Sequence, residues 1–203
     1  FQTIEGGYFF KDKKYKTSIL PSASFALSFL VDGHLYIRQR TIAIQEIVSH
    51  HLSPVKGGEL FTDERCLDII PHPGGGYMLL TGDSGFYSFS PRVNDGFHRL
   101  HYPCDQYLVD CFVLGAKYID DSTIVIHSRV GVGFIDLKGN LTGTLTTEDG
   151  IIDNSVAGIQ VDRDKQLWLI TGNVISHVFY HNNCTFFHIQ KSGYEGDVNS
   201  IID

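Results

Sequence analysis

Positive charge, long apolar runs and helical periodicity are all scarce in this sequence of 203 residues. Its formal net charge is −7, which argues against a nucleic-acid-binding surface, because such a surface needs clustered Lys and Arg. The apolar runs are much too short to cross a bilayer. A basic start followed by an apolar block, which marks a signal peptide, is also missing, although a mature exported domain would lack it as well.

Cysteine is scarce too, and the spacing of the cysteines excludes the common metal-binding patterns. None of the four belongs to a CxxC pair or to a Cys/His arrangement typical of zinc. We interpret Cys66 and Cys111 as small apolar strand residues. A disulfide between Cys104 and Cys111 is one of several pairings that the four cysteines, with Cys184 as the fourth, allow.

Familiar catalytic motifs are absent. The sequence has no GxSxG, HExxH or P-loop motif. Three of the ten histidines, His177, His181 and His188, lie near one hairpin, but their spacing does not define a metal site. The stretch DRDKQ at 162–166 resembles a calcium loop without its glycine and its terminal glutamate, so we expect a charged turn. The sequence therefore predicts no metal, no cofactor and no catalytic residues.

What the sequence does contain is a repeat. An aromatic-aliphatic run recurs at intervals of about 40 to 45 residues, as HLYIRQR at 34–40, YMLLTGD at 77–83, TIVIHSR at 123–129 and LWLITGN at 167–173. An apolar alternation precedes each run, and another strand-like stretch follows it, with turns rich in Gly, Asp or Lys between them. Four short strands at this interval are typical of a blade of a β-propeller.

We therefore predict an all-β fold, a β-propeller of four-stranded antiparallel blades. A meander of four strands cannot bury both of its faces alone, and stacked blades bury them against one another. A β-sandwich with accidental spacing is the alternative. The predicted units are a partial blade at 1–20, whole blades at about 21–60, 61–102, 103–147 and 148–192, and the inner strand of a further blade at 193–203.

The best-kept copy of the repeat, residues 149–178, resembles the repeat of the two-component regulator propeller family. The positions that match are Gly150, Asn154, Ser155, Val156, Ile159, Asp162, Leu167, Trp168 and Thr171. Gln166 stands where the family has a turn glycine, and Ile152 or Asp153 stands where it has a proline. The closing GDVNSIID begins another copy.

The resemblance implies an exported sensor. Such propellers form the periplasmic region of bacterial hybrid two-component systems, ahead of a small β-sandwich, a membrane helix and a kinase, and many respond to oligosaccharides. We therefore expect a periplasmic segment that senses an oligosaccharide-like ligand and catalyses nothing itself. Its partners would be other blades or domains of the same receptor, or a second copy in a homodimer, but not nucleic acid. The membrane would be reached only through a segment outside this sequence.

Two alternatives from other classes stay open. A carbohydrate-active propeller enzyme would need two facing carboxylates, and the plausible suppliers are Asp63, Asp83, Asp105 and Asp153. A purely structural propeller that mediates dimerisation would need no ligand pocket.

The two ends of the sequence read as complementary parts of one blade. FQTI, YFFKD and KYKTSIL supply three outer strands, and VNSIID supplies an inner strand. In one interpretation, 198–202 pairs beside 1–4 and closes a five-bladed ring, which removes exposed sheet edges. In the other, the sequence is a slice of a larger, seven-bladed propeller. The number of strands permits the five-bladed ring, whereas the usual architecture of the family favours a slice of a larger propeller.

One face of the disc is the candidate ligand site. In a propeller, the turns between second and third strands share a face with the links that precede the inner strands. The candidate ligand-binding side chains on this face are Arg38, Arg40, Arg65, Asp83, Arg129 and Asn173. Forked guanidinium groups beside carboxylates and amides suit a polyhydroxyl or carboxylated sugar. The alternative is a solvated surface on which Arg and Asp pair with each other.

Trp168, the only tryptophan, invites a second site hypothesis, in which it stacks on a sugar. Its position in the repeat argues against that function. The equivalent positions carry Tyr36, Met78 and Val125, an apolar set suited to packing between blades. We therefore expect Trp168 in the core.

Overall fold

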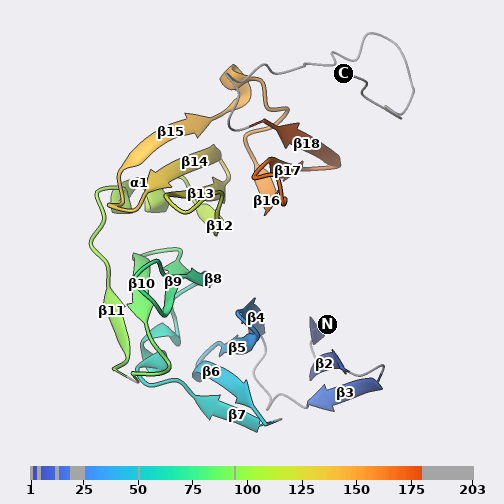
Figure 1. Cartoon of the computed structure of the whole chain (residues 1–203), viewed down its shortest axis with the longest axis vertical. Coiled ribbons are helices and arrows are strands. Elements are labelled where there is room, and N and C mark those ends of the chain that lie inside the picture. The colour runs from blue at the N-terminus through green and yellow to red at the C-terminus, as the bar shows by residue number, and fades with distance from the viewer. Residues whose placement is uncertain are drawn as a thin grey trace.

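Five antiparallel sheets follow one another around an arc in the computed structural model (Figure 1). The structure describes residues 2–3, 6–11, 14–18, 26–49, 51–93 and 95–179. Within this part of the chain, three sheets have four strands and the first and last sheets have three. Strands that follow one another in the chain pair with one another, so each sheet is a simple meander.

The strands of the first two sheets are β1 (Gln2–Thr3), β2 (Gly6–Lys11), β3 (Lys14–Ser18), β4 (Ala26–Val31), β5 (His34–Gln39), β6 (Ala43–Val48) and β7 (His51–Pro54). The next two sheets contain β8 (Cys66–Pro71), β9 (Tyr77–Thr81), β10 (Gly85–Phe89), β11 (Phe97–Arg99), β12 (Val113–Tyr118), β13 (Thr123–Ser128), β14 (Gly131–Asp136) and β15 (Leu141–Leu145). The last described sheet contains β16 (Val156–Val161), β17 (Leu167–Thr171) and β18 (Val174–Val178).

The arrangement confirms the predicted β-propeller. The first strands of successive sheets, β4, β8, β12 and β16, lie toward the inside of the arc (Figure 1), and β8 contacts both β4 and β12. The four aromatic-aliphatic runs form the second strands, β5, β9, β13 and β17, as the repeat predicts. The three strands expected near the N-terminus are also present, as β1, β2 and β3.

The core consists of three apolar layers, one at each junction between neighbouring sheets from β4 to β18. Both faces of β9 and β13 are buried, because each of these strands lies in a sheet with a neighbour on either side. Tyr36, Met78 and Val125 occupy one position of the repeat, and each is at most 1% exposed. The inter-blade packing that their spacing predicts is therefore confirmed.

Trp168 occupies the same position of the repeat, but the prediction that it is buried is wrong. Its side chain is 38% exposed. The buried apolar residues of β17 are Leu167 and Leu169, which face the preceding sheet. Trp168 points to the opposite face, and no sheet in the described part of the chain covers that face.

A short helix interrupts the strands where only strand and turn are predicted. Helix α1 (Asp105–Asp110) fills the link between β11 and β12. Its buried side chain, Leu108, packs in the apolar layer together with Cys104 and Cys111, which flank the helix. Two short 3-10 helices, η1 (Gly58–Phe61) and η2 (Thr147–Asp149), fill two other links.

The helix corrects the cysteine predictions. Cys66 begins β8, as expected, but Cys111 ends the helix and does not lie in a strand. Cys66, Cys104 and Cys111 are all free thiols, so the Cys104–Cys111 disulfide does not form. Burial raises the pKa of the Cys104 thiol to about 12, which keeps it protonated and unreactive at neutral pH. Cys184 lies outside the described residues.

The strands of the four sheets from β4 to β18 fall within the four predicted blade ranges. β4–β7 fall within 21–60, β8–β11 within 61–102, β12–β15 within 103–147 and β16–β18 within 148–192. Residues 193–203 lie outside the described residues, so the choice between a closed five-bladed ring and a slice of a larger propeller stays a prediction. In the part of the chain that is described, no helix is long and apolar enough to span a membrane.

Burial between sheets should dominate stability, which two leucines can test. Leu80 is fully buried between two sheets, whereas Leu30 is 75% exposed. We expect Leu80→Ala to lower the free energy of unfolding by about 2–5 kcal/mol, because it leaves a cavity. Leu30→Ala should change that free energy by no more than about 0.5 kcal/mol. Urea unfolding followed by circular dichroism measures both, and equal losses in the two variants would contradict the layered core.

Candidate functional site

The turns between second and third strands and the links between sheets share one face, here called the turn face. It comprises residues 38–42, 62–65, 82–84, 103–107, 128–130, 151–155 and 171–174. Hydrogen bonds join neighbouring segments of this face: the amide of Thr41 donates to the carbonyl of Thr62 (3.1 Å), and the amide of Gly82 donates to that of Arg65 (2.8 Å).

Arg38 is a predicted ligand-binding residue whose guanidinium binds backbone carbonyls. Its side chain is buried. The guanidinium donates to the carbonyl of Phe61 (3.2 Å), of Thr62 (3.0 Å) and of Glu64 (2.7 Å). These carbonyls belong to the link between the second and third sheets, so Arg38 holds that link in place through its Nε and Nη2 groups.

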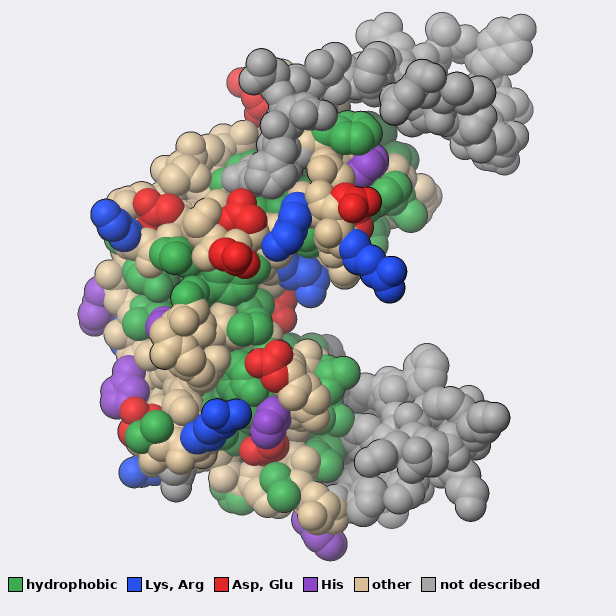
Figure 2. Space-filling view, in the orientation of Figure 1, with side chains coloured by type: hydrophobic (Ala, Val, Ile, Leu, Met, Phe, Trp, Pro, Cys, Tyr) green, Lys and Arg blue, Asp and Glu red, His purple; other side chains and the backbone are tan. Residues whose placement is uncertain are grey.

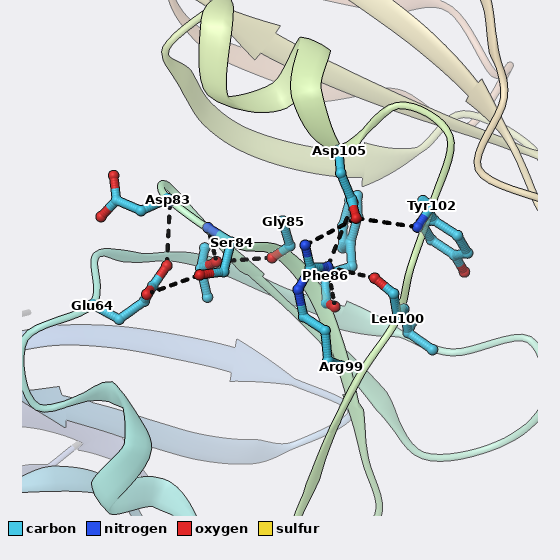
Figure 3. Close-up of polar contacts among 10 residues, drawn as sticks. Glu64, Asp83, Ser84, Gly85, Phe86, Arg99, Leu100, Tyr102 and Asp105 are labelled. Carbon is cyan, nitrogen blue, oxygen red and sulfur yellow. Dashed lines mark hydrogen bonds and ion pairs between the residues drawn. The ribbon is translucent and has the colours of Figure 1, made fainter.

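Arg65 and Asp83 form an ion pair on the turn face. This pairing is what the alternative of a solvated surface predicts, so their role in binding a ligand stays a prediction. Arg65 donates to the Asp83 carboxylate (2.9 Å) and to the carbonyl of Gly82 (3.2 Å). Glu64 completes the cluster by accepting hydrogen bonds from the Asp83 amide and from the Ser84 hydroxyl, both at 3.2 Å (Figure 3). The Arg65 and Asp83 side chains are 50% and 56% exposed. Solvent therefore reaches both partners of this ion pair.

A second ion pair fixes the start of helix α1, and no local sequence motif marks its arginine. Arg99 on β11 donates to Asp105 Oδ2 (2.9 Å), and the same oxygen accepts from the Tyr102 amide (3.3 Å) (Figure 3). Arg99 also donates to the carbonyls of Phe86 and Leu100. The pair is about three-quarters buried, so it ties strand to helix and offers little to a ligand.

Three other predicted residues are exposed but separate. Arg40, Arg129 and Asn173 lie in turns of three different sheets. Among the described residues, no hydrogen bond or ion pair joins these three side chains to one another. Of the six predicted residues, Arg65 and Asp83 form an ion pair, and Arg38 binds backbone carbonyls. Arg40, Arg129 and Asn173 are exposed in separate turns.

The carboxylates considered for an enzyme mostly have local partners. Asp83 and Asp105 are in ion pairs with Arg65 and Arg99, and Asp153 accepts a hydrogen bond from the Ser155 amide (2.9 Å). Asp63 is exposed.

The DRDKQ stretch forms a tight turn. Asp162 Oδ1 accepts from the amides of Asp164 and Gln166, both at 2.9 Å, and its Oδ2 accepts from Trp168 Nε1, also at 2.9 Å. The hydrogen bond from Trp168 is the main reason that the pKa of Asp162 is lowered. The described residues contain no group of three or more His, Cys, Asp or Glu side chains that could hold a metal ion, and His181 and His188 lie outside the described residues.

An unpredicted polar cluster lies where the inner strands begin. In three successive sheets the pairing register shifts just after the first pair, at Cys66/Asp68, Val113/Gly115 and Val156/Gly158. Such β-bulges re-aim side chains. Asp68 Oδ2 thereby accepts a hydrogen bond from the Ala116 amide of the next sheet (3.3 Å).

His127 forms the corresponding link one sheet further on. Its Nδ1 lies 2.8 Å from the carbonyl oxygen of Val156 in β16. Because a carbonyl only accepts, Nδ1 must carry the hydrogen, which leaves a lone pair on Nε2 of the neutral ring. A Cβ on Gly115 would lie 2.5 Å from His127 Nε2 and 3.4 Å from Asp68 Oδ2. A side chain at position 115 would therefore displace the His127 ring.

Burial shifts both titrating groups of this cluster toward their neutral forms. It raises the pKa of Asp68, which the positive charge of Lys117 partly offsets. It also lowers the pKa of His127, which the hydrogen bond to Val156 and the charge of Asp68 partly offset. Both shifts bring the pKa values of the two groups closer together, and general acid–base catalysis is most efficient when such values lie near the working pH. Residues from different sheets form this cluster, and no local motif marks it.

The comparisons with known proteins establish the fold. No protein-family model matches the chain, and no curated protein matches its sequence. Among solved structures, the extracellular domain of the hybrid two-component system BT3049 of B. thetaiotaomicron is similar, with a TM-score of 0.61 and 15% identity over 90% of this chain and 27% of that one. The extracellular domain of a second system of that organism, BT4673, gives 0.51 and 11% over 78% and 24%.

An enzyme is similar at a comparable level. A catalytically inactive virginiamycin B lyase from Staphylococcus aureus, crystallised with quinupristin, gives a TM-score of 0.57 and 16% identity over 88% of this chain and 60% of that one. The chain thus spans about a quarter of the length of the two sensor domains and three-fifths of the lyase. Likeness at this identity reflects a shared propeller fold.

Two arginines close together in the sequence provide a test of the role of Arg38. Arg38→Ala should lower the free energy of unfolding by about 2–4 kcal/mol, because three link carbonyls lose a charged donor. Arg40→Ala, at an exposed position, should change it by less than about 0.5 kcal/mol. Chemical unfolding measures both. If Arg38→Ala is as stable as the Arg40 variant, the guanidinium does not stabilise the link.

The lowered pKa of His127 predicts acid sensitivity. Below about pH 6.5 the unfolded chain takes up a proton that the folded His127 resists, so the free energy of unfolding decreases as the pH falls toward the folded pKa. His127→Asn keeps an N–H donor near Nδ1 but does not titrate, so this decrease should shrink. Unfolding at pH 5 to 8 measures it, with His101→Asn, an exposed position, as control. An unchanged pH profile would contradict the assignment.

Proposed function

We propose that this chain is part of the ligand-sensing propeller of a two-component receptor, and that it binds an oligosaccharide-like ligand on its turn face. Two observations support the receptor assignment. Residues 149–178 resemble the repeat of two-component regulator propellers, and the fold is like that of the extracellular domains of two hybrid two-component systems. The segment would then function outside the cytoplasm, with its kinase in another part of the receptor.

The observation that carries the ligand proposal is the exposed Arg65–Asp83 pair. An ion pair this exposed contributes about 0–1 kcal/mol to stability, so exchanging it for hydrogen bonds to sugar hydroxyls costs little. A guanidinium and a carboxylate side by side supply the donors and acceptors that a polyhydroxyl ligand needs. Lys, Arg, Asp and Glu side chains also border the upper side of the hollow of the arc (Figure 2).

The packing between sheets suggests how binding would be transmitted. Arg38 on β5 holds the link to the next sheet, and His127 on β13 holds the inner strand of the sheet after its own. Neighbouring sheets are therefore joined by polar contacts as well as by apolar layers. A ligand that spans two segments of the turn face would favour one relative position of two blades, and the change would pass on as a rigid-body movement.

A second candidate function is catalysis by a propeller enzyme. The observation that favours it is the Asp68–His127 cluster, whose two groups are suited to proton transfer and whose His127 Nε2 carries a lone pair. The similarity of the fold to a lyase is consistent with this candidate. We give it second place, because His127 is buried, whereas both side chains of the Arg65–Asp83 pair are about half exposed to solvent.

Calorimetric titration of a panel of neutral and acidic oligosaccharides tests the proposal. We expect one class to bind, and we expect Arg65→Ala to weaken its binding about tenfold, since a charged hydrogen bond is worth roughly 1.5–3 kcal/mol. Arg92→Ala is the matched control, because Arg92 is exposed in the turn between β10 and β11, at the opposite end of the strands.

Three outcomes would count against the proposal. The absence of binding by any oligosaccharide would remove the ligand assignment. Equal weakening by Arg65→Ala and Arg92→Ala would remove the turn face as the site. Release of product from a bound oligosaccharide, abolished by His127→Asn, would favour the enzyme.

A further inference from the structure

A phenylalanine follows helix α1 at a position where neither burial nor backbone conformation favours one. Phe112 is 55% exposed, whereas Phe61, Phe86 and Phe89 are at most 4% exposed. Its φ is 51°, in the left-handed region, at the position after a helix where glycine is usually found. Glycine would fit this backbone with less strain, and a polar side chain would suit the exposure to solvent.

Other strained residues of the chain follow a simpler rule. Among the described residues, the other non-glycine residues with positive φ are all polar: Asp32, Thr41, Ser49 and Lys165. Phe112 is the apolar one. Strain of this kind is concentrated at functional sites, where the side chain is needed for a contact that the fold itself does not require.

Phe112 occupies the same position of the repeat as Arg65. Each residue directly precedes an inner strand that begins with a register shift, Arg65 before β8 and Phe112 before β12. These two strands contact each other. Helix α1 also begins beside the turn of Asp83, because a Cβ on Gly85 would lie 2.7 Å from Asp105 Oδ1 (Figure 3). Phe112 is therefore the next residue around the arc from the Arg65–Asp83 pair.

Exposed apolar and polar residues adjoin Phe112. Val109 and Val130 are 38% and 44% exposed. Backbone hydrogen bonds bring their segments together: the amide of Phe112 donates to the carbonyl of Val109 (3.2 Å), and the amide of Arg129 donates to that of Cys111 (3.3 Å). The Arg129 side chain is exposed and forms no ion pair within the described part of the chain. A group of exposed apolar side chains bordered by polar ones marks an interaction site.

We propose that Phe112 is a platform on which a sugar ring of the bound oligosaccharide stacks, beside the Arg65–Asp83 pair. This inference rests on the proposed function and narrows the ligand class to oligosaccharides of pyranose rings with equatorial hydroxyls. The C–H groups on the faces of such a ring suit the negative face of an aromatic ring. Its hydroxyls point outward from the ring edge, where Arg129 and the Arg65–Asp83 pair supply hydrogen-bond donors and acceptors.

The size of the platform favours a sugar over a protein partner. A stable protein interface takes about 20–30 residues from each side. The apolar platform here consists of three side chains, those of Val109, Phe112 and Val130, and charged residues border it. An area of this size matches one or two sugar rings. A second copy of the chain, or another protein, is therefore an outcome for the test to detect.

Calorimetric titration with defined probes tests the platform. Cellotetraose and laminaritetraose have only equatorial hydroxyls, and mannotetraose has an axial one on each ring. We expect a gluco-oligosaccharide to bind more tightly than mannotetraose. Phe112→Leu should weaken its binding about tenfold, because leucine keeps an apolar side chain but has no flat face, and Phe112→Trp should retain the affinity. Leu137→Ala is the matched control, since Leu137 is 41% exposed between β14 and β15, at the opposite end of the strands.

Thermal unfolding separates binding from a structural role. Phe112→Gly should weaken binding as Phe112→Leu does, yet leave the melting temperature unchanged or raise it, because glycine relieves the positive φ. Lys165→Gly is its control: Lys165 has a φ of 62° in the exposed turn between β16 and β17, so the same relief should leave binding unchanged.

The outcomes distinguish this inference from the proposed function. Binding that Arg65→Ala weakens and Phe112→Leu does not would overturn the platform alone. Binding that Phe112→Leu weakens and Arg65→Ala does not would support the platform and remove the ion pair from the site. No binding by any of the three probes would overturn the platform, and the wider oligosaccharide panel then decides the proposed function. A marked fall in the melting temperature of Phe112→Gly, or a dimer in sedimentation velocity that Phe112→Leu dissociates, would overturn the platform as well.

Discussion

The sheets β8–β11 and β12–β15 each have two apolar faces, and both faces are buried against neighbouring sheets. A four-stranded meander is too small to fold over itself, so its stability comes from stacking. The three apolar layers between β4 and β18 show this directly. The same requirement explains why the last described sheet, without a covering neighbour, exposes Trp168 and Ile175.

Polar contacts then fix how the stacked sheets sit relative to one another. Asp68 reaches the Ala116 amide, His127 reaches the Val156 carbonyl, and Arg38 binds three carbonyls of a link. Apolar layers alone allow neighbouring sheets to slide slightly past one another, whereas hydrogen bonds, which need a defined direction, do not. Function in a propeller can then reside in turns such as that of Asp83, because the sheets beneath them form a rigid support.

The fold was largely predictable because its signal is repeated. Four aromatic-aliphatic runs at a nearly constant interval locate the second strands, and Tyr36, Met78 and Val125 lie between sheets as their spacing predicts. Helix α1 was missed because its apolar spacing, Cys104, Leu108 and Cys111, lasts less than two turns and continues into a strand. The candidate site was predicted less well. Arg65 and Asp83 do lie together, but nothing local distinguishes the buried Arg38 from the exposed Arg40.

The sequence by itself determined the all-β architecture, the order of the strands and the side chains that carry the repeat. These features depend on local alternation and on spacing along the chain, which a sequence displays. Only the tertiary structure decided which polar groups meet. Whether an arginine binds a carbonyl or faces water, and whether Asp68 and His127 share one glycine-lined space, depends on sheets that are far apart in the chain. The exposure of Trp168 has the same origin, because burial is a property of the neighbouring sheet.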